Sequence, residues 1–149
     1  MEKITHTNTA AAIHLTSLLQ YCIPFGNFIF PIIIWSSARD KSEFVDAQGK
    51  QVINFQLSLF IYSLLIVAIL VPIFIYSIFS VGNATYYSNE LFEGTLNFAQ
   101  LSGTIIIAIV LTTFFIILKI VEFLLIIYAA VKVSQGINYK YPLTINFIK

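Results

Sequence analysis

The stretch QVINFQLSLFIYSLLIVAILVPIFIYSIFS, residues 51–80, decides the fold class because it contains no Asp, Glu, Lys or Arg. A helix needs about 20 apolar residues to cross the ~30 Å hydrocarbon core of a bilayer, so this stretch is long enough to span one. We predict a transmembrane helix here. Its amphipathic N-terminal part, which starts near Glu43, is expected to extend into the cytoplasm.

Two further charge-free stretches run from Ile4 to Ala38 and from Gly94 to Leu118. Only 10% of the 149 residues are charged, against roughly 25% in soluble domains, and a small chain has a large surface to cover. The sequence therefore predicts an all-α integral membrane helical bundle in one domain, residues 1–149. Its about three transmembrane helices are expected at residues 10–36, 51–80 and 103–133.

The first of these segments is interrupted by Pro24, Gly26 and Pro31. Pro24 lacks an amide donor and would clash with the carbonyl of Gln20, so the helix should break there. We predict two half-helices that cross the membrane together, with the break at Pro24–Pro31 turned toward the bundle because irregular backbone is not tolerated in lipid. The alternative is a re-entrant hairpin that returns to the side from which it started.

The distribution of Lys and Arg predicts the orientation. The 36–50 connection and the C-terminal region each carry three such residues, and the 81–102 loop carries none. The positive-inside rule then places the 36–50 loop and the C-terminus in the cytoplasm and the 81–102 loop outside. Gly136 is expected to cap the last helix, and the tail, residues 137–149, is expected to lie along the membrane interface.

Several polar residues inside the predicted spans are candidates for interaction sites. Gln51, Asn54, Ser58 and Tyr62 follow one another at offsets of 3, 4 and 4, which puts them on one helix face. Such a stripe is typical of hydrogen bonding between helices, and the alternative is that it lines a path for a substrate.

The third predicted span contains one lysine and one glutamate, Lys119 and Glu122. Charged groups at this depth are costly and usually pair inside the bundle, so these two either neutralise each other or belong to an ion path. His14 lacks a second intramembrane histidine and is expected to bond a neighbouring helix. Pro24 and Asn27 complete the candidate positions because they lie at the break.

The sequence offers little material for catalysis. It has two histidines, one cysteine and none of the common nucleophile, zinc or phosphate-loop motifs. We therefore expect a protein that is not an enzyme, with no cofactor, no metal site and no internal disulfide. No cluster of Lys and Arg indicates a nucleic acid as partner.

Six strings resemble a bacterial family of small multi-pass membrane proteins of unknown function. That family is similar to the twenty-kilodalton Tic component of the chloroplast inner-envelope translocon (Tic-twenty-like). The resemblance implies a bacterial cytoplasmic (inner) membrane as the location and a role related to translocation, and it brings no catalytic residues. The strings are His14–Leu19, Ile23–Asn27, Pro31–Trp35, Phe44–Asp46, Gln51–Gln56 and Gly136–Leu143.

Three functions are compatible with these features. The leading hypothesis is a non-enzymatic accessory or scaffold subunit that contacts membrane lipid and a membrane-protein partner, or further copies of itself. The alternative is a homo-oligomeric channel or carrier for ions or small solutes. A stress or immunity protein that acts on lipids or peptides is the third possibility.

Overall fold

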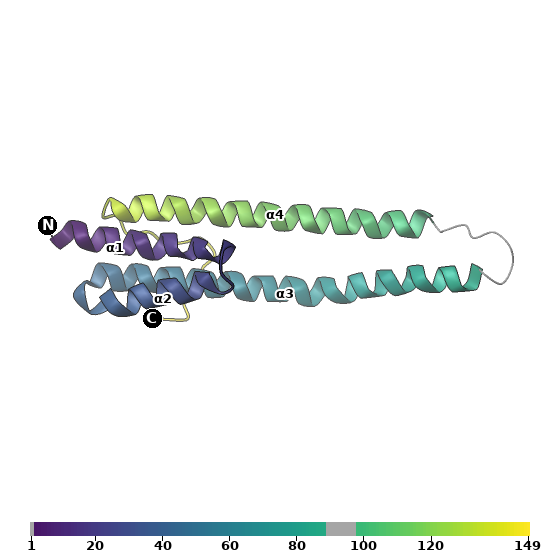
Figure 1. Ribbon diagram of the computed structural model, residues 1–149, viewed down its shortest axis with the longest axis horizontal. Helices are drawn as coiled ribbons and strands as arrows, with labels where there is room; N and C mark the ends of the chain where they lie inside the picture. Colours follow the sequence, from purple (N-terminus) through teal and green to yellow (C-terminus); the bar gives the residue numbers. More distant parts are fainter. Residues whose placement is uncertain (1, 89–97) are drawn as a thin grey trace. The chain divides into compact units, whose positions relative to one another are not determined.

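The computed structural model describes residues 2–88 and 98–149, and within these ranges the regular elements are all helices (Figure 1). This agrees with the predicted all-α class. The elements are α1 (Glu2–Thr16), η1 (Ser17–Tyr21), α2 (Gly26–Ala38), η2 (Arg39–Lys41), α3 (Glu43–Ser88) and α4 (Phe98–Ser134).

The chain forms two compact units. Unit 1 comprises Met1–Ile61 and Ile120–Lys149, and it holds α1, α2, the start of α3, the end of α4 and the C-terminal tail. Unit 2 is Tyr62–Lys119 and contains the remaining parts of the two long helices. Every contact described below lies within one of these units.

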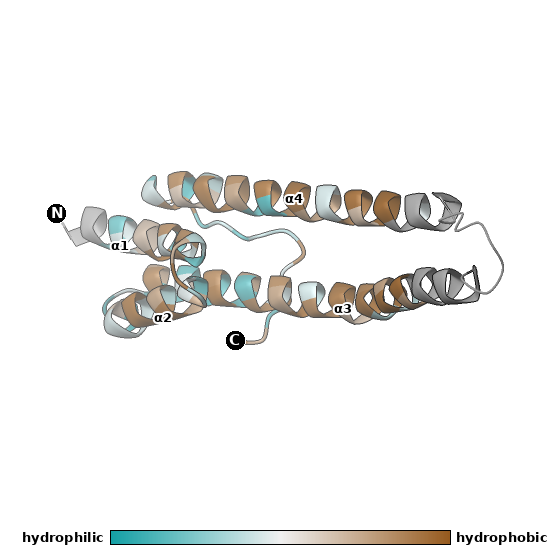
Figure 2. Ribbon diagram, turned by 45° about the vertical axis from the view of Figure 1, so that its right-hand side comes forward, coloured by the Kyte–Doolittle hydropathy of each residue, from teal (hydrophilic) through white to brown (hydrophobic). Residues whose placement is uncertain are grey.

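Helices α3 and α4 are the two that are long and apolar enough to cross a membrane. The candidate spans are Glu43–Tyr76 and Ile105–Ser134, and only 6% of the most apolar window of each is buried. Helices in the core of a soluble protein would be covered on most sides, whereas these expose mainly hydrophobic residues (Figure 2). They correspond to the predicted spans at 51–80 and 103–133.

A third span is not confirmed. The predicted segment 10–36 folds as two short helices of 15 and 13 residues, and neither meets the length of a span. The chain reverses between them, so α1 and α2 pack as an antiparallel hairpin (Figures 1 and 2). This is the geometry of the alternative, a hairpin that returns to its starting side.

The break itself lies earlier than predicted. It covers Cys22–Phe25, where Phe25 adopts a left-handed conformation (φ 60°) and α2 starts at Gly26. A side chain at Gly26 would come within 2.7 Å of the Leu19 carbonyl oxygen, so glycine permits the tight return. Pro31 lies inside α2 without ending it, contrary to the predicted break at Pro24–Pro31.

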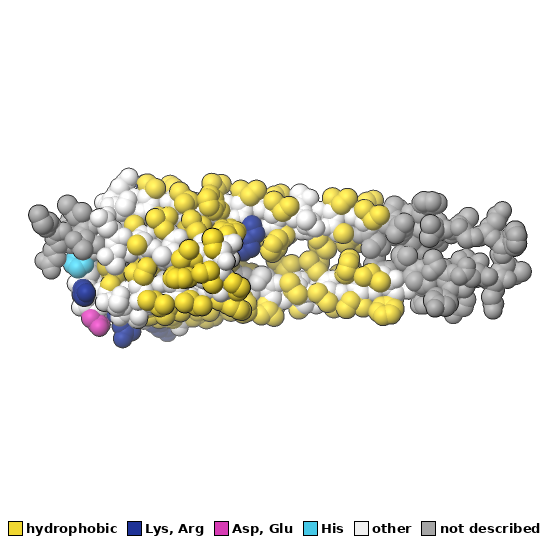
Figure 3. Space-filling view, viewed as in Figure 1, with side chains coloured by type: hydrophobic (Ala, Val, Ile, Leu, Met, Phe, Trp, Pro, Cys, Tyr) yellow, Lys and Arg dark blue, Asp and Glu magenta, His cyan; other side chains and the backbone are white. Residues whose placement is uncertain are grey.

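The core of unit 1 is formed by one face each of α1, α3 and α4. Small residues at Ala10 and Ala129 allow these helices to approach closely, and Ile13, Val52 and Ile126 fill the space between them. Hydrophobic side chains also cover much of the visible surface (Figure 3). Apart from some Lys or Arg atoms near the middle of this view, the visible charged side chains lie at the end that holds the α2–α3 connection.

Gly136 ends α4 as predicted. Its φ is +78°, its N–H donates to the Val133 carbonyl, and the next N–H, of Ile137, donates to the Lys132 carbonyl at 3.2 Å. This pair of bonds is the Schellman arrangement, which satisfies the last carbonyls of a helix and turns the chain away. The tail that follows packs against unit 1, where Tyr141 is only 5% exposed. The expectation that the tail lies along the membrane interface stays a prediction.

The predicted 81–102 loop is shorter than expected, because α3 continues to Ser88 and α4 begins at Phe98. Residues 89–97, which include Glu90 and Glu93, lie outside the described residues.

Candidate functional site

Buried polar side chains are concentrated in unit 1. They come from α1, η1, α3 and α4, and most of them lie on the helix faces that pack against each other or against the tail. A buried polar group is costly unless it is hydrogen-bonded, so the partners of these groups indicate what the cluster does. The buried polar residues are Thr7, His14, Ser17, Gln48, Asn54, Gln56, Ser58 and Glu122.

His14 connects α1 to both α3 and the tail. Its Nδ1 lies 2.7 Å from the Tyr141 hydroxyl, and its Nε2 lies 3.2 Å from the side-chain amide of Gln48. When the amide nitrogen of Gln48 faces the ring, it donates to Nε2 and to the Tyr139 carbonyl, while its oxygen accepts the Tyr139 N–H. His14 is then neutral and donates from Nδ1 to Tyr141. These four residues, His14, Gln48, Tyr139 and Tyr141, form what we call the His14 cluster.

The environment of the cluster keeps its members uncharged. Burial lowers the pKa of His14 from 6.5 to about 4, because the buried site disfavours the charged ring. Burial also raises the pKa of the Tyr141 hydroxyl well above its ordinary value. The Tyr141 ring stacks on Phe55 of α3, with ring centroids 3.9 Å apart, and this contact fixes the tail against the helix.

Asn54 and Ser58, which we call the tail clamp, hold the last part of the tail. The Asn54 side-chain oxygen accepts the N–H groups of Phe147 (3.1 Å) and Ile148 (2.9 Å), and its nitrogen donates to the Ile148 carbonyl (3.0 Å). Ser58 accepts the N–H of Ile145 at 2.8 Å and donates to the Asn54 carbonyl. Two side chains therefore satisfy four backbone groups of a segment that has no regular structure of its own.

The predicted stripe on α3 is thus divided. Asn54 and Ser58 bind the tail backbone, which neither of the two predicted roles anticipated. Gln51 is half-buried, and its amide oxygen has no hydrogen-bond partner among the described residues. Tyr62 is half-buried and belongs to unit 2.

Glu122 lies on the inner face of α4 in unit 1. It is 5% exposed, and its carboxylate accepts a hydrogen bond from the Gln20 amide at 2.8 Å. Lys119 belongs to unit 2, where its ammonium lies 5.9 Å from the centroid of the Phe115 ring. The predicted choice between a structural and a functional role for these two residues stays open.

The remaining predicted positions lie at the hairpin. Pro24 is exposed in the turn, and the Asn27 amide at the start of α2 donates to Gln56 of α3 at 2.8 Å. This bond joins the hairpin to α3, and the bond between Gln20 and Glu122 joins it to α4.

Sequence reasoning missed one further cluster, at the junction of α2 and α3. The indole N–H of Trp35 donates to Asp46 at 2.9 Å, and Asp46 also pairs with Lys50 at 2.6 Å. The Trp35 ring covers Gly49, and a Cβ at that position would overlap the ring. The guanidinium carbon of Arg39 lies over the same ring, 5.5 Å from its centroid. The signal was present in the sequence as a single tryptophan shortly before an isolated glycine in a helical pattern.

These polar groups connect the segments of unit 1 to one another. Within residues 2–88 and 98–149, no three His, Cys, Asp or Glu side chains come together as a metal site requires. Most of the polar atoms bind other parts of the same unit. The arrangement can fix the hairpin and the tail to the two long helices.

A search of curated proteins and a search of solved structures each gave no match. The sequence does match one family model over residues 5–148, nearly its whole length. This match corrects the resemblance to the Tic component of the chloroplast translocon, because the matched family is a different one and nothing else supports a translocon relative. The chain belongs to the MamF/MmsF family, the magnetosome magnetite crystal formation protein family.

Proposed function

We propose that this protein is a non-enzymatic component of the magnetosome membrane that acts in the formation of magnetite crystals. The observation that carries the proposal is the family match over residues 5–148. The described residues support an accessory or scaffold role, since their buried polar groups are used to fix the fold. Its partners are membrane lipid and either another membrane protein or further copies of this chain.

The proposed topology has two crossings, by α3 and α4. The hairpin α1–α2 enters the membrane and returns to the same side, so the N-terminus, the 36–50 loop and the C-terminus share the cytoplasmic side. Its turn is suited to such a position because the N–H groups of Cys22, Ile23 and Gly26 all bond to backbone carbonyls. The apolar residues Ile23 and Phe25 are exposed at the tip, where lipid would cover them.

The proposal is tested by deletion of the gene in the host bacterium and electron microscopy of its crystals. We expect crystals of altered size or number, restored by the natural protein. The Asn54→Ala/Ser58→Ala variant should restore them poorly, and Asn8→Ala, an exposed change on α1, should restore them fully. Crystals that are indistinguishable from those of the parent strain would contradict the proposal.

Purification in mild detergent tests the scaffold role separately. An accessory subunit should be recovered with a stoichiometric partner or as an oligomer. Recovery of a monomer alone, from membranes of a crystal-forming strain, would argue against this role while leaving the crystal phenotype unaffected.

A second candidate is a homo-oligomeric channel or carrier, and the burial of the Glu122 carboxylate within a candidate span favours it. It predicts that Glu122→Gln or Lys119→Gln changes proton or ion flux in liposomes that contain the purified protein. Flux that is equal for both variants and the natural protein would count against it. The tail occupies Asn54 and Ser58, so these two residues do not support the channel.

A further inference from the structure

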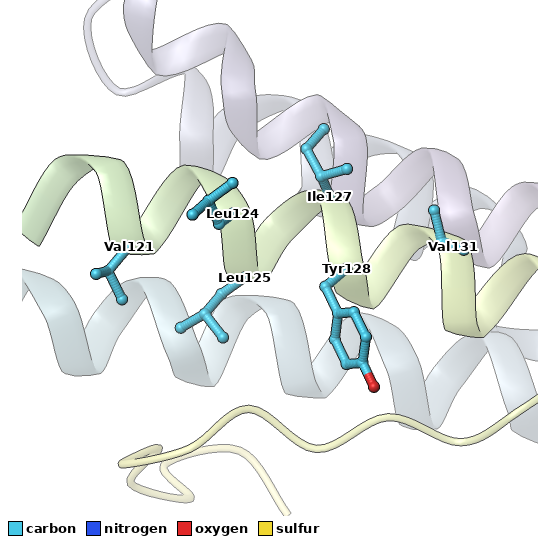
Figure 4. A pocket seen from close by; sticks show the side chains of 6 residues that line it. All are labelled: Val121, Leu124, Leu125, Ile127, Tyr128 and Val131. Carbon is cyan, nitrogen blue, oxygen red and sulfur yellow. The ribbon is translucent and has the colours of Figure 1, made fainter.

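The outer face of α4 in unit 1 carries a shallow apolar groove. Figure 4 shows the side chains that line it, all from this one helix. The opposite face of the same turns is the buried face that packs into the unit, with Ile126 and Ala129 fully covered. The groove is lined by Val121, Leu124, Leu125, Ile127, Tyr128 and Val131.

The groove has the length of one half of a bilayer. Val121 and Val131 are ten positions apart on α4, which is roughly 15 Å at 1.5 Å per residue. Half of the ~30 Å hydrocarbon core is the same distance. An acyl chain from a single leaflet therefore fits along the groove.

One end of the groove is positively charged. Lys132 follows Val131 directly, and its ammonium lies 5.6 Å from the centroid of the Tyr128 ring. The Tyr128 ring also meets the Tyr139 ring of the tail edge to face at 5.6 Å, which brings the neighbouring, exposed Lys140 to the same end of the helix.

The segment that carries these lysines has no acidic side chain. Residues 123–149 contain no Asp or Glu and three lysines. The last acidic side chain before them, Glu122, lies on the buried face of α4 and is 5% exposed. An anionic group that approaches Lys132 from the membrane surface would find only positive side chains in this part of the sequence.

We propose that this surface is a binding site for one anionic phospholipid. The acyl chain lies along the groove from Val131 toward Val121, and the phosphate contacts the ammonium groups of Lys132 and Lys140 beside the Tyr128–Tyr139 pair. Aromatic and basic residues together are typical of the headgroup region of a membrane. The inference requires the membrane location and does not depend on the role in magnetite formation.

Native mass spectrometry of the full chain tests the headgroup contacts. The detergent-purified protein is incubated with phosphatidylglycerol or with phosphatidylcholine of the same acyl chains, and the retained lipid is counted. We expect one retained phosphatidylglycerol, with affinity lowered about five-fold by each of Lys132→Gln and Lys140→Gln. Lys41→Gln, the same change on the exposed η2 turn, should have no effect.

The groove is tested by Leu124→Trp, which fills it, against Leu64→Trp in unit 2. The two leucines are similarly exposed, at 59% and 54%. Only the change at Leu124 should lower retention. Equal retention of both lipids by the natural protein, equal binding by Lys140→Gln and Lys41→Gln, or equal binding by the two tryptophan variants would each overturn the proposal. Lys140 is exposed and outside any helix, so its variant reports on binding even if Lys132→Gln fails to fold.

Discussion

At Gly49 the packing of a single residue determines how α2 meets α3. The Trp35 ring lies where a Cβ would be, so Gly49→Ala forces the ring or the helix to move. We expect a loss of about 1–3 kcal/mol in the free energy of unfolding, as for other overpacked sites. Thermal unfolding in detergent measures it, and the emission of Trp35, the sole tryptophan, should shift as its environment changes.

Gly103 provides the matched control for this change. A Cβ there would meet nothing within 4 Å among the residues that the structure describes, and the residue lies inside α4. Gly103→Ala should therefore be neutral or stabilising by up to about 1 kcal/mol, because alanine favours the helix. If the two alanine variants unfold at the same temperature, the proposed fit between Trp35 and Gly49 is wrong.

His14 makes the stability of unit 1 depend on pH. Helix α1 lies outside the two candidate spans, and burial there holds the pKa of His14 at about 4 in the folded chain, against 6.5 when unfolded. The unfolded chain therefore binds a proton first as the pH falls, so stability decreases from about pH 6.5 and stops decreasing near pH 4. At pH 5 the loss is on the order of 2 kcal/mol.

A comparison of thermal unfolding at pH 7.5 and pH 5 in detergent checks this dependence. His14→Gln removes the titrating ring, so its unfolding temperature should vary less with pH than that of the natural protein. His6→Gln, at the partly exposed histidine of α1, should leave the dependence unchanged. A steeper loss of thermal stability between pH 7.5 and pH 5 in His14→Gln than in the natural protein would contradict the lowered pKa of His14.

At the scale of the element, the tail depends on the tail clamp. Asn54→Ala removes the partners of two N–H groups and one carbonyl in the tail, each worth roughly 1 kcal/mol when bonded. We expect faster amide exchange at Phe147 and Ile148 and faster proteolysis after Tyr141, without loss of α3. Asn8→Ala should behave like the natural protein, and equal protection of the tail in both variants would show that Asn54 does not hold it.

The end of α4 depends on the left-handed conformation of Gly136. Alanine at φ +78° is expected to cost about 1–2 kcal/mol, whereas asparagine tolerates this region better. The unfolding temperature should therefore fall in the order natural protein, Gly136→Asn, Gly136→Ala. Steric overlap is not the cause, because the nearest atom to a Cβ would be Thr7 Cγ2 at 3.7 Å. An alanine variant as stable as the natural protein would rule out the capping role.

The two long helices and the cap at Gly136 could be predicted from the sequence, because each follows from local pattern. A charge-free apolar stretch or a glycine after a helical pattern is sufficient evidence for them. The hairpin was not predictable in the same way. An apolar stretch with Pro24 in its middle has the same composition whether the chain continues or reverses there, and Pro31 proved compatible with a helix.

The polar residues illustrate the same limit at longer range. Spacing placed Asn54 and Ser58 on one face of a helix, which is correct. Their partners, however, lie 87 to 94 positions further along the chain, in the tail. His14 was expected to bond a neighbouring helix, and it does so through Gln48, but its contact with Tyr141 depends on the path of the tail. Such contacts follow from tertiary packing rather than from periodicity.

At the scale of the whole molecule, the proposed topology has two spans instead of three. With two crossings, the N-terminus, the α2–α3 connection and the tail face one side of the membrane. The end of α3 at Ser88 and the start of α4 at Phe98 face the other. With three crossings, the N-terminus would change sides. The number of spans also determines which residues can meet a partner in the cytoplasm and which can meet a growing crystal.

Labelling with a membrane-impermeant maleimide measures directly on which side of the membrane each segment lies, and therefore how many spans the chain has. In a Cys22→Ser background, single cysteines at Asn8, Lys41, Asn146 and Glu93 are probed in sealed vesicles of known orientation. The two-span topology predicts that Asn8→Cys, Lys41→Cys and Asn146→Cys react from the cytoplasmic side and Glu93→Cys from the opposite side. Reaction of Asn8→Cys from the same side as Glu93→Cys would contradict it.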